Sequence, residues 1–377
     1  MAIGISTGGR HTLESIDFVE RAAWLALSLI PGLGARRLAQ LISRFGTARG
    51  AILAPSEAIT EIEGFTARAA QAIRSVDLRL ADQLVADALA AGQELLVPPD
   101  EGDPARLRAI PDPPAVLFCR GDRSLFARPA VAIVGSRQHT RYGAEVAARL
   151  GEEAARAGVL VVSGMARGLD AVAQAAALDA GGTTIGVLGT AVDVVYPASN
   201  RELFQRVTAH GLLVSEYPPG QRPHQGSFPR RNRLISGLAD ALVVVEAAEA
   251  SGTLITVNCA LEQGRDVLAV PGPINSPTSR GTNRLLRDGA TPILEPADLL
   301  AALGIAGDDK PSTPVEAPCS LTPEEARVFD ALSSDPRHID ELALHTGLPI
   351  GLLLGTLLGL ELGGLIEQLP GSMFRRR

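Results

Sequence analysis

Three features that would point to other classes of protein are missing from this sequence. Its three cysteines, Cys119, Cys259 and Cys319, have no metal-ligand spacing, so we expect unpaired thiols in a reducing compartment rather than disulfides or a metal site. No apolar run approaches the ~20 residues that cross a bilayer. Residues 1–10 lack the basic and then apolar pattern of a signal peptide. We therefore expect a cytoplasmic protein without a membrane segment and without a metal.

A dinucleotide-binding fingerprint is also missing, although one loop invites that interpretation. Residues 131–134 are typical of a buried strand, and the tripeptide GSR follows at 135–137. There is no G-x-G-x-x-G pattern, and the next strand ends in Ser163 and Gly164, where an acid that binds ribose would stand. The sequence therefore argues against a hydride-transferring enzyme, and we expect no bound cofactor.

The length and charge of the chain favour several domains with a cationic site that is only local. A chain of 377 residues exceeds the usual size of one domain, and 46% apolar residues are enough for a large core. The net charge of -7 weighs against a protein that coats DNA generally. Because charge effects decay over about 8 Å at physiological salt, a local basic groove is compatible with that balance.

Periodicity and composition divide the chain into four segments. Strands that alternate with helices indicate an α/β core of the extended Rossmann-like type, which follows a helical region and precedes a linker rich in Asp, Pro, Ser and Thr. Three helices and a hairpin at the end suggest a winged helix. The segments are a helical domain (SAM-like or helix-hairpin-helix-like) at 1–95, the core at 96–303, the linker at 304–320 and the winged-helix domain at 321–377.

The helical region contains two copies of a helix, a glycine-containing hairpin and a second helix. The first hairpin is PGLG at 31–34, and the second, at 62–65, has lost one glycine. Such a hairpin can offer backbone N–H groups at a helix start to a phosphate. A small helical module that uses glycine for a tight turn explains the same pattern. Both interpretations stay open.

The core predicts a parallel sheet with helices on both faces. Continuous apolar strands separated by helices are typical of such sheets, and right-handed crossovers place every strand-to-helix loop on one edge. Two short strands, near 95–97 and 115–118, are expected to flank the main sheet. We predict strands at 131–134, 159–162, 184–188, 212–215, 241–245 and 267–270, and helices at 141–157, 168–180, 200–209, 231–239 and 252–263.

The most informative stretch is residues 222–233, which carry five basic or potentially basic side chains, one aromatic and no acid. They stand between the predicted strands 212–216 and 241–246, so we expect a cationic loop at the strand ends, where α/β folds bind ligands. Arginine forks fit phosphates, and Phe228 is suited to stack on a base. The stretch therefore predicts a polyanion site.

Three glycine-containing strand ends, at 135–137, 163–168 and 251–253, resemble one another and are expected to face this loop as a phosphate-binding trough. No Ser/His/Asp, Cys/His or metal constellation accompanies them, so we predict binding and no catalytic residue. Asp170 is expected to cap its helix or pair with Arg167. The candidate binding residues are Gly135, Ser136, Arg137, Ser163, Gly164, Arg167, Gly168, Phe228, Arg230, Arg231, Asn232, Arg233, Ser251, Gly252 and Thr253.

The third predicted helix of the C-terminal segment, at 349–362, contains no basic residue. A helix that reads DNA needs arginines, lysines or amides to reach bases and phosphates. We therefore expect this helix to dock a protein or form a dimer surface.

Residues 107–290 resemble the DNA-processing protein A family (DprA, also called Smf) through many ordered motifs. These are DPP at 112–114, VAIVGSR at 131–137 with Tyr142 and Gly143, VSGMARGLD at 162–170, VLG at 187–189 with Asp193, Tyr196 and Pro197, SEYPPG at 215–220, FPRRNRLISGL at 228–238, VVEA at 244–247, SGTLIT at 251–256 and VPG at 270–272. So many matches in order over about half the chain are highly specific.

This resemblance implies an extended Rossmann core that holds single-stranded DNA in a basic pocket containing the GSR and FPRRNR positions. It also implies a homodimer that loads the recombinase RecA onto incoming strands in natural transformation and helps to displace single-strand-binding protein. Two positions depart from the family pattern: Gln174 stands where a histidine is common, and Thr190 and Ala191 replace a usual Cys-Gly. The histidine would matter if it had a catalytic role, so its replacement by Gln174 is compatible with a binding function.

Two other functions were weighed against DNA binding. A nucleotide phosphoribohydrolase of the cytokinin-activating LOG type shares the sheet and a glycine-threonine loop that residues 251–253 echo, but its Pro-Gly-Gly-x-Gly-Thr loop is not found. A sequence-specific regulator that acts through the C-terminal segment is disfavoured by the apolar helix at 349–362. The sequence therefore favours a DNA-binding recombination mediator that is not an enzyme.

Overall fold

The computed structural model describes residues 11–98, 104–224, 226–305, 321–333 and 336–376. The chain forms two compact units, Met1–Gly307 and Asp308–Arg377. The division falls inside the linker predicted at 304–320, most of which lies outside the described residues. Each unit is considered by itself below.

The first unit is built on a mostly parallel sheet whose described strands run in the order β1-β2-β6-β5-β4-β3-β7-β8-β9. Only the β1–β2 and β2–β6 pairings are antiparallel, so the predicted parallel core and its two flanking strands are confirmed. The strands are β1 (Glu94–Leu96), β2 (Leu117–Gly121), β3 (Ala130–Val134), β4 (Leu160–Ser163), β5 (Thr184–Val187), β6 (Leu212–Ser215), β7 (Ala241–Val244), β8 (Asp266–Ala269) and β9 (Thr291–Pro292).

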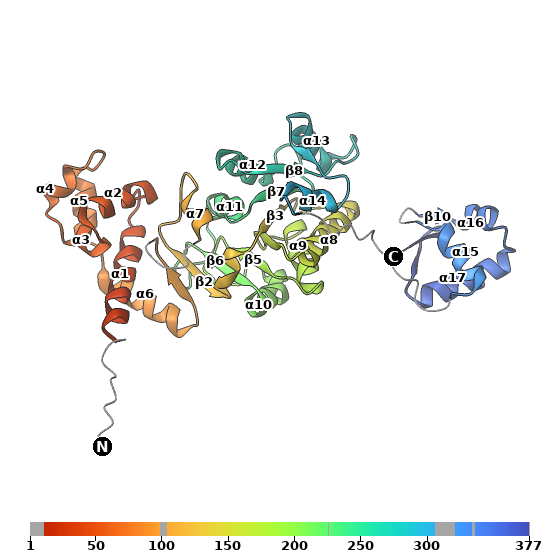
Figure 1. Ribbon diagram of the computed structural model, residues 1–377, viewed down its shortest axis with the longest axis horizontal. Helices are drawn as coiled ribbons and strands as arrows, with labels where there is room; N and C mark the ends of the chain where they lie inside the picture. Colours follow the sequence, from red (N-terminus) through yellow and green to blue (C-terminus); the bar gives the residue numbers. More distant parts are fainter. Residues whose placement is uncertain (1–10, 99–103, 225, 306–320, 334–335, 377) are drawn as a thin grey trace, which may run out of the picture. The chain divides into compact units, whose positions relative to one another are not determined.

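Helices cover both faces of this sheet (Figure 1). Alternation along β3 shows why, because Ala130, Ala132 and Val134 pack into one apolar cluster while Val131 and Ile133 pack into the other. One face carries α8 (Arg141–Arg156), α9 (Leu169–Asp179), α10 (Arg201–His210) and α14 (Ala297–Ala302), and the other carries α7 (Ala105–Arg108), α11 (Ser227–Gly237), α12 (Thr253–Glu262) and α13 (Arg280–Arg287).

The N-terminal helices share a hydrophobic core with the sheet. Trp24 and Leu38 belong to the same buried cluster as Phe118 of β2 and Phe204 of α10. The predicted boundary at 95/96 falls inside β1, so this region continues directly into the sheet. The helices are α1 (His11–Ser28), α2 (Ala35–Phe45), α3 (Ala48–Leu53), α4 (Ser56–Thr60), α5 (Ala67–Arg74) and α6 (Leu78–Ala90). The two predicted hairpins join α1 to α2 and α4 to α5.

Helix α11 corrects the prediction of a loop at 222–233. It begins at Ser227, directly after Gly226, whose φ of 92° is left-handed. Pro229 is the third helical residue, a position where a missing N–H costs nothing because the first turn has no intrahelical acceptor. The proline and glycines that suggested a loop therefore mark a helix start, and the cationic residues are held at fixed helical spacing.

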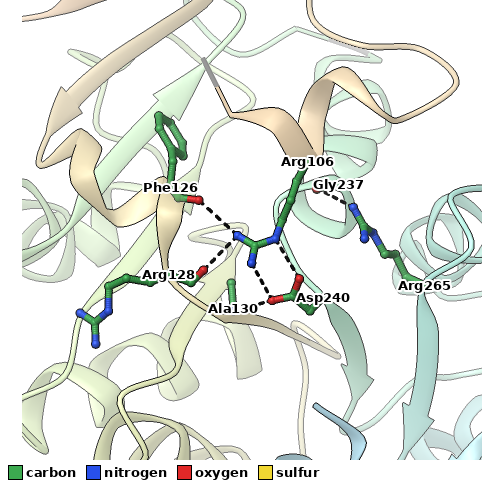
Figure 2. Close-up of polar contacts among 7 residues, drawn as sticks. All are labelled: Arg106, Phe126, Arg128, Ala130, Gly237, Asp240 and Arg265. Atoms are coloured by element: carbon green, nitrogen blue, oxygen red, sulfur yellow. Dashed lines mark hydrogen bonds and ion pairs between the residues drawn. The ribbon is translucent and has the colours of Figure 1, made fainter. Parts of the chain in front are cut away.

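Arg106 of α7 anchors the amino ends of the neighbouring strands β3 and β7 (Figure 2). Its Nε and Nη2 donate to the two carboxylate oxygens of Asp240 at 2.8 and 2.9 Å, and its Nη1 donates to the carbonyls of Phe126 and Arg128 at 3.2 and 2.9 Å. Asp240 in turn accepts from the N–H of Ala130 at 2.9 Å. This network fixes β3 and β7 side by side at the end opposite to the loops that were predicted to bind a ligand.

The second unit has the three helices and the hairpin that were predicted. Thr322 and Glu325 form a capping box at the start of α15. A sheet of order β10-β12-β11 completes the unit. Its elements are α15 (Pro323–Ala331), β10 (Arg337–His338), α16 (Ile339–Thr346), α17 (Ile350–Leu362), β11 (Ile366–Leu369) and β12 (Met373–Arg376).

Helix α17 buries one side and exposes the other. Leu353, Leu357 and Leu360 are buried, whereas Leu358 and Leu362 are 56% and 82% exposed. Within the described residues no single helix has the length and apolar character needed to cross a membrane, although α16 and α17, bent by 108°, meet those criteria as a pair.

Candidate functional site

The three predicted strand-end loops lie next to one another because their strands are neighbours. β3 pairs with β4 on one side and with β7 on the other, all in parallel. From β3 the chain builds outward through β4, β5 and β6, and then returns to add β7, β8 and β9 on the opposite side. The order of strands thus reverses at β3, and α/β sheets bind ligands at such a switch point.

Two adjoining cavities, of about 600 and about 330 Å³, open at this edge and share Arg137, Ala166, Phe228 and Arg231 among their walls. We call them together the trough. Of the candidate residues, the trough is lined by Gly135, Ser136, Arg137, Gly164, Arg167, Phe228, Arg231, Asn232, Ser251, Gly252 and Thr253. Ser163, Gly168, Arg230 and Arg233 do not line it.

Two glycines allow close packing around the strand-end loops, at positions where a side chain would clash with its neighbours. Gly168, with φ 86°, precedes α9, and a Cβ there would lie 2.3 Å from the carbonyl oxygen of Ser136. A Cβ on Gly164 would lie 2.7 Å from Nη2 of Arg231. The β3 and β4 loops therefore meet at backbone contact, which explains the glycines that the sequence places beside Arg167.

The β7 loop is tied to the β3 loop through hydroxyls. Oγ1 of Thr253 donates to the carbonyl of Gly135 at 3.2 Å, and Oγ of Ser251 donates to Oγ1 of Thr253 at 3.0 Å. The backbone of Gly252, between them, is exposed. These bonds bring the third loop into the trough and keep its glycine at the surface.

Exposed cations and aromatic rings are combined in the trough. Arg137 and Arg167 are both exposed. The guanidinium carbon of Arg137 lies 5.8 Å from the ring centroid of Phe228, within cation–π range, and the Phe228 ring lies 5.3 Å from that of Tyr196. Tyr196 was quoted in the motif match but was not assigned to the site; its place beside Phe228 adds it. A separation of 32 residues hid this contact from any local pattern.

Arg231 requires a correction, because its guanidinium is committed to the protein interior. The residue is 4% exposed, and its Nη1 donates to the carbonyl of Gly164 at 2.7 Å and to that of Val187. Burial lowers the pKa of Arg231 to about 10, against the opposing effect of Asp170. Arg231 therefore forms the floor of the trough and braces two strand ends, rather than reaching out to a phosphate.

Asp170 is likewise turned inward, and its predicted pairing with Arg167 is wrong. It is 6% exposed and accepts from the N–H of Gly164 at 3.1 Å. Burial raises the pKa of Asp170, and the charge of Arg231 opposes that rise. Asp170 lines the larger cavity, but its carboxylate balances the buried guanidinium of Arg231 beneath the exposed arginines of the trough.

Arg233 requires the second correction. Its side chain is 10% exposed, its Nη2 donates to Oε1 of Glu216 at 2.6 Å, and its Nε donates to Oδ2 of Asp112 at 2.8 Å. Burial alone would lower the pKa of Arg233, but the two carboxylates outweigh burial and raise it. Arg230 is exposed on the same side of α11, with Nε 3.9 Å from Oε2 of Glu216. The helix therefore turns Arg230 and Arg233 away from the trough.

Ser163 is the third candidate residue whose predicted contact with a ligand is corrected. Its buried side chain links strands, and so does that of Gln174. Ser163 is fully buried, and its hydroxyl donates to the carbonyl of Ile133 at 2.6 Å. Gln174, also fully buried, accepts from the N–H of Met165 at 3.2 Å and donates to Oγ1 of Thr184 at 3.0 Å. Both side chains link strands under the trough, so neither is available to a ligand. Among the described residues, no cluster of His, Cys, Asp or Glu has a geometry that would hold a metal ion.

Comparison with known families identifies both units. Residues 94–304 match the family model for DNA recombination-mediator protein A, and residues 312–372 match that for the DprA winged helix domain. Protein Smf of Synechocystis is 34% identical over 394 residues, covering 95% of this chain and 99% of the relative. DNA processing protein DprA of Bacillus subtilis is 43% identical over 201 residues, covering 53% of this chain and 68% of the relative.

Solved structures agree with this assignment. DNA processing protein A of Streptococcus pneumoniae is 32% identical, with a TM-score of 0.66, over 75% of this chain and 97% of that one. DNA processing protein A of Helicobacter pylori, described for its single-stranded DNA binding mode, is 33% identical, with a TM-score of 0.52, over 56% of this chain and 95% of that one. The strand-end motifs, the mostly parallel sheet and these matches together show that the chain belongs to the DprA/Smf family of DNA-processing recombination mediators.

Proposed function

We propose that the trough binds single-stranded DNA. The observation that carries this proposal is the arrangement of Arg137, Phe228 and Tyr196, in which an exposed guanidinium lies over an aromatic pair inside a cavity. Single-strand binding sites combine cations that follow the backbone with rings on which bases stack. The relative from Helicobacter pylori, described for its single-stranded DNA binding mode, supports the same conclusion.

The recessed position of the Phe228 ring favours a single strand over a duplex. Phe228 lines both cavities of the trough instead of projecting from the surface. A base in a duplex is stacked and paired, and moving it into a cavity costs a few kcal/mol. A base of a flexible single strand reaches the cavity without that cost. Phosphates then meet Arg137 and Arg167, with exposed backbone at Gly252 as a further donor.

The test is a titration of labelled oligonucleotides by fluorescence anisotropy. Wild-type protein is expected to bind single-stranded DNA more tightly than duplex of the same length. Arg137→Glu is expected to weaken single-strand binding more than tenfold, about 1.4 kcal/mol or more, and to make its salt dependence shallower. Arg149→Glu, an equal charge change at an exposed position of α8 outside the trough, is the matched control. Equal affinity for both variants and wild type would remove Arg137 from the site.

The biological role follows from membership in a family of recombination mediators. We propose that the bound strand is handed to the recombinase RecA, that single-strand-binding protein is displaced in the process, and that the chain acts as a homodimer in the cytoplasm. The supporting observation is the family match over 94–304. RecA-dependent ATP hydrolysis on DNA precoated with single-strand-binding protein is expected to start sooner with this protein, and Arg137→Glu is expected to abolish that gain.

We further propose that the protein acts without chemistry of its own. Asp170, the buried carboxylate beneath the trough, faces Arg231 and accepts a backbone N–H, so its environment serves structure. Incubation of the purified protein with AMP is expected to release no adenine. Release at an enzymic rate would instead favour a phosphoribohydrolase.

A further inference from the structure

A separate cavity of about 200 Å³ lies on the other side of α11, where the first N-terminal hairpin meets the sheet. Its walls include Leu33, Gly34 and Ala35 from the α1–α2 connection, and Arg230 and Arg233 from α11. We call it the hairpin cavity. The first turns of α11 therefore separate two cavities, with Phe228 and Arg231 on the trough side.

The hairpin cavity contains the amino end of α2, which has no side-chain cap. Gly34 is the N-cap residue of this 11-residue helix, and among the described residues no side chain caps its first N–H groups. The second hairpin differs, because Oγ1 of Thr66 caps α5 by accepting from the N–H of Ala69 at 3.3 Å. An uncapped helix start carries partial positive charge and donors that suit an anion.

An unsatisfied guanidinium group lines the same cavity. Nη1 of Arg233 is buried and has no hydrogen-bond partner among the described residues, although Nε and Nη2 are held by Asp112 and Glu216. A buried donor without an acceptor is costly, about 1–3 kcal/mol, so this nitrogen needs an acceptor that the described residues do not supply. Arg230, with a side chain 62% exposed, adds a solvent-exposed cation at the rim.

Acids are also present, and they limit what the hairpin cavity accepts. Glu216 is 8% exposed; its Oε1 is engaged by Arg233, whereas its Oε2 is buried without a hydrogen-bond partner among the described residues. Asp112 is 60% exposed and screened by water. The charges of these acids offset those of the arginines, so a free dianion gains little net attraction. A phosphate of low charge, already tethered to a strand held nearby, fits better because tethering raises its effective concentration.

We propose that the hairpin cavity binds a phosphodiester of the same DNA strand that occupies the trough, and that the strand crosses the first turn of α11 between the two. This inference rests on the proposed function of the trough. It assigns the first glycine hairpin to DNA binding and the second, which is capped by its own threonine, to structure. A helix with its side chains is about 10 Å wide, a span that a few nucleotides cover.

The decisive variant is Gly34→Asp in the full chain. A Cβ at Gly34 meets nothing within 4 Å, its φ of -72° is open to any residue, and aspartate is a favoured N-cap, so the variant is expected to fold at least as well as wild type. Its carboxylate would stand where the phosphate is proposed to bind. Thr66→Asp places the same added charge at the equivalent position of the second hairpin and is the matched control.

Affinities are measured for oligothymidylates of about 6 and about 25 nucleotides, the shorter chosen to fill the trough alone. Gly34→Asp is expected to weaken binding of the long strand about fivefold to tenfold and to reduce its salt slope by about 0.7, the value for one phosphate contact on a single strand. It is expected to leave the short strand unaffected, and Thr66→Asp to leave both unaffected.

Three results would overturn the inference: unchanged binding of the long strand by Gly34→Asp, an equal loss for both lengths, or the same loss with Thr66→Asp. A melting temperature that inorganic phosphate raises in wild type but not in Gly34→Asp, with unchanged DNA binding, would assign the cavity to free phosphate instead. If wild type binds neither length, the proposed function of the trough fails, and that outcome is distinct from a failure of the hairpin cavity alone.

Discussion

Arginines lie on both sides of helix α11, but their exposure and their pairing with acids differ between the two sides. On the trough side, Phe228 stands beside the exposed Arg137, and the carboxylate of Asp170 beneath them is buried against Arg231. On the hairpin side, Arg233 is held by Glu216 and Asp112. A run of arginines in a sequence therefore does not measure the charge available to a ligand, because acids distant in the sequence decide which guanidinium groups remain accessible.

The comparison predicts that Arg233 contributes to stability and Arg137 to binding. Arg233→Met is expected to lower the free energy of unfolding by about 3–5 kcal/mol, because it leaves Glu216 buried without its partner. Urea denaturation of the first unit measures this loss. Replacing Glu216 by Leu in the same chain is expected to recover much of it, since the stranded charge is then removed. A stability equal to wild type in the single variant would mean that the pair is not formed.

Loss of the ring on the trough side is expected to have the next largest effect. Phe228→Ala removes the stacking surface and the partner of Arg137, and is expected to weaken single-strand binding by about 1–3 kcal/mol. Phe228→Trp retains a ring and is the control, expected to bind within a few-fold of wild type. Anisotropy titrations with a short oligothymidylate measure both. If the alanine variant bound as tightly as wild type, bases would not be stacking at this ring.

The smallest effect is expected at Arg230. Arg230→Met removes a cation that is 62% exposed and whose Nε is 3.9 Å from Oε2 of the buried Glu216. Because water screens this guanidinium and the contact is long, we expect it to contribute about 0–1 kcal/mol. Stability and short-strand binding are therefore expected to stay near wild-type values in the same two assays. A large loss of short-strand affinity would mean that Arg230 contacts DNA in the trough. It would contradict the conclusion that α11 separates Arg230 from the trough.

Elements with a strong local signal were predicted closely. The strand predicted at 212–215 is β6 (Leu212–Ser215), and that predicted at 131–134 is β3 (Ala130–Val134), because a continuous apolar run bounded by turn residues specifies a buried strand. β9 (Thr291–Pro292) was not predicted, since it has two exposed residues and a proline. The start of α11 was misplaced by four residues because proline and glycine signal both loops and helix starts.

The site was predicted in outline and corrected in detail. Glycines at 135, 164, 168 and 252 lie where strand-end loops converge, as expected from a parallel sheet in which such loops share one edge. The inward orientation of Ser163 and Arg231 was not predictable, because it depends on which carbonyls the neighbouring strands leave open. The contact of Tyr196 was not predictable either, because it joins a loop to Phe228 in the first turn of α11, 32 residues away.

The sequence by itself determined the sheet, the edge at which its loops gather and the family of the chain, because apolar periodicity and ordered motifs are local signals that survive without coordinates. The tertiary structure alone decided which arginines stay exposed in the trough. Asp112 precedes Arg233 by 121 residues, and only folding brings this carboxylate within 2.8 Å of the guanidinium. Burial and pairing depend on such long-range contacts. They make Arg231 and Arg233 internal braces of the fold, while Arg137 and Arg167 stay exposed in the trough.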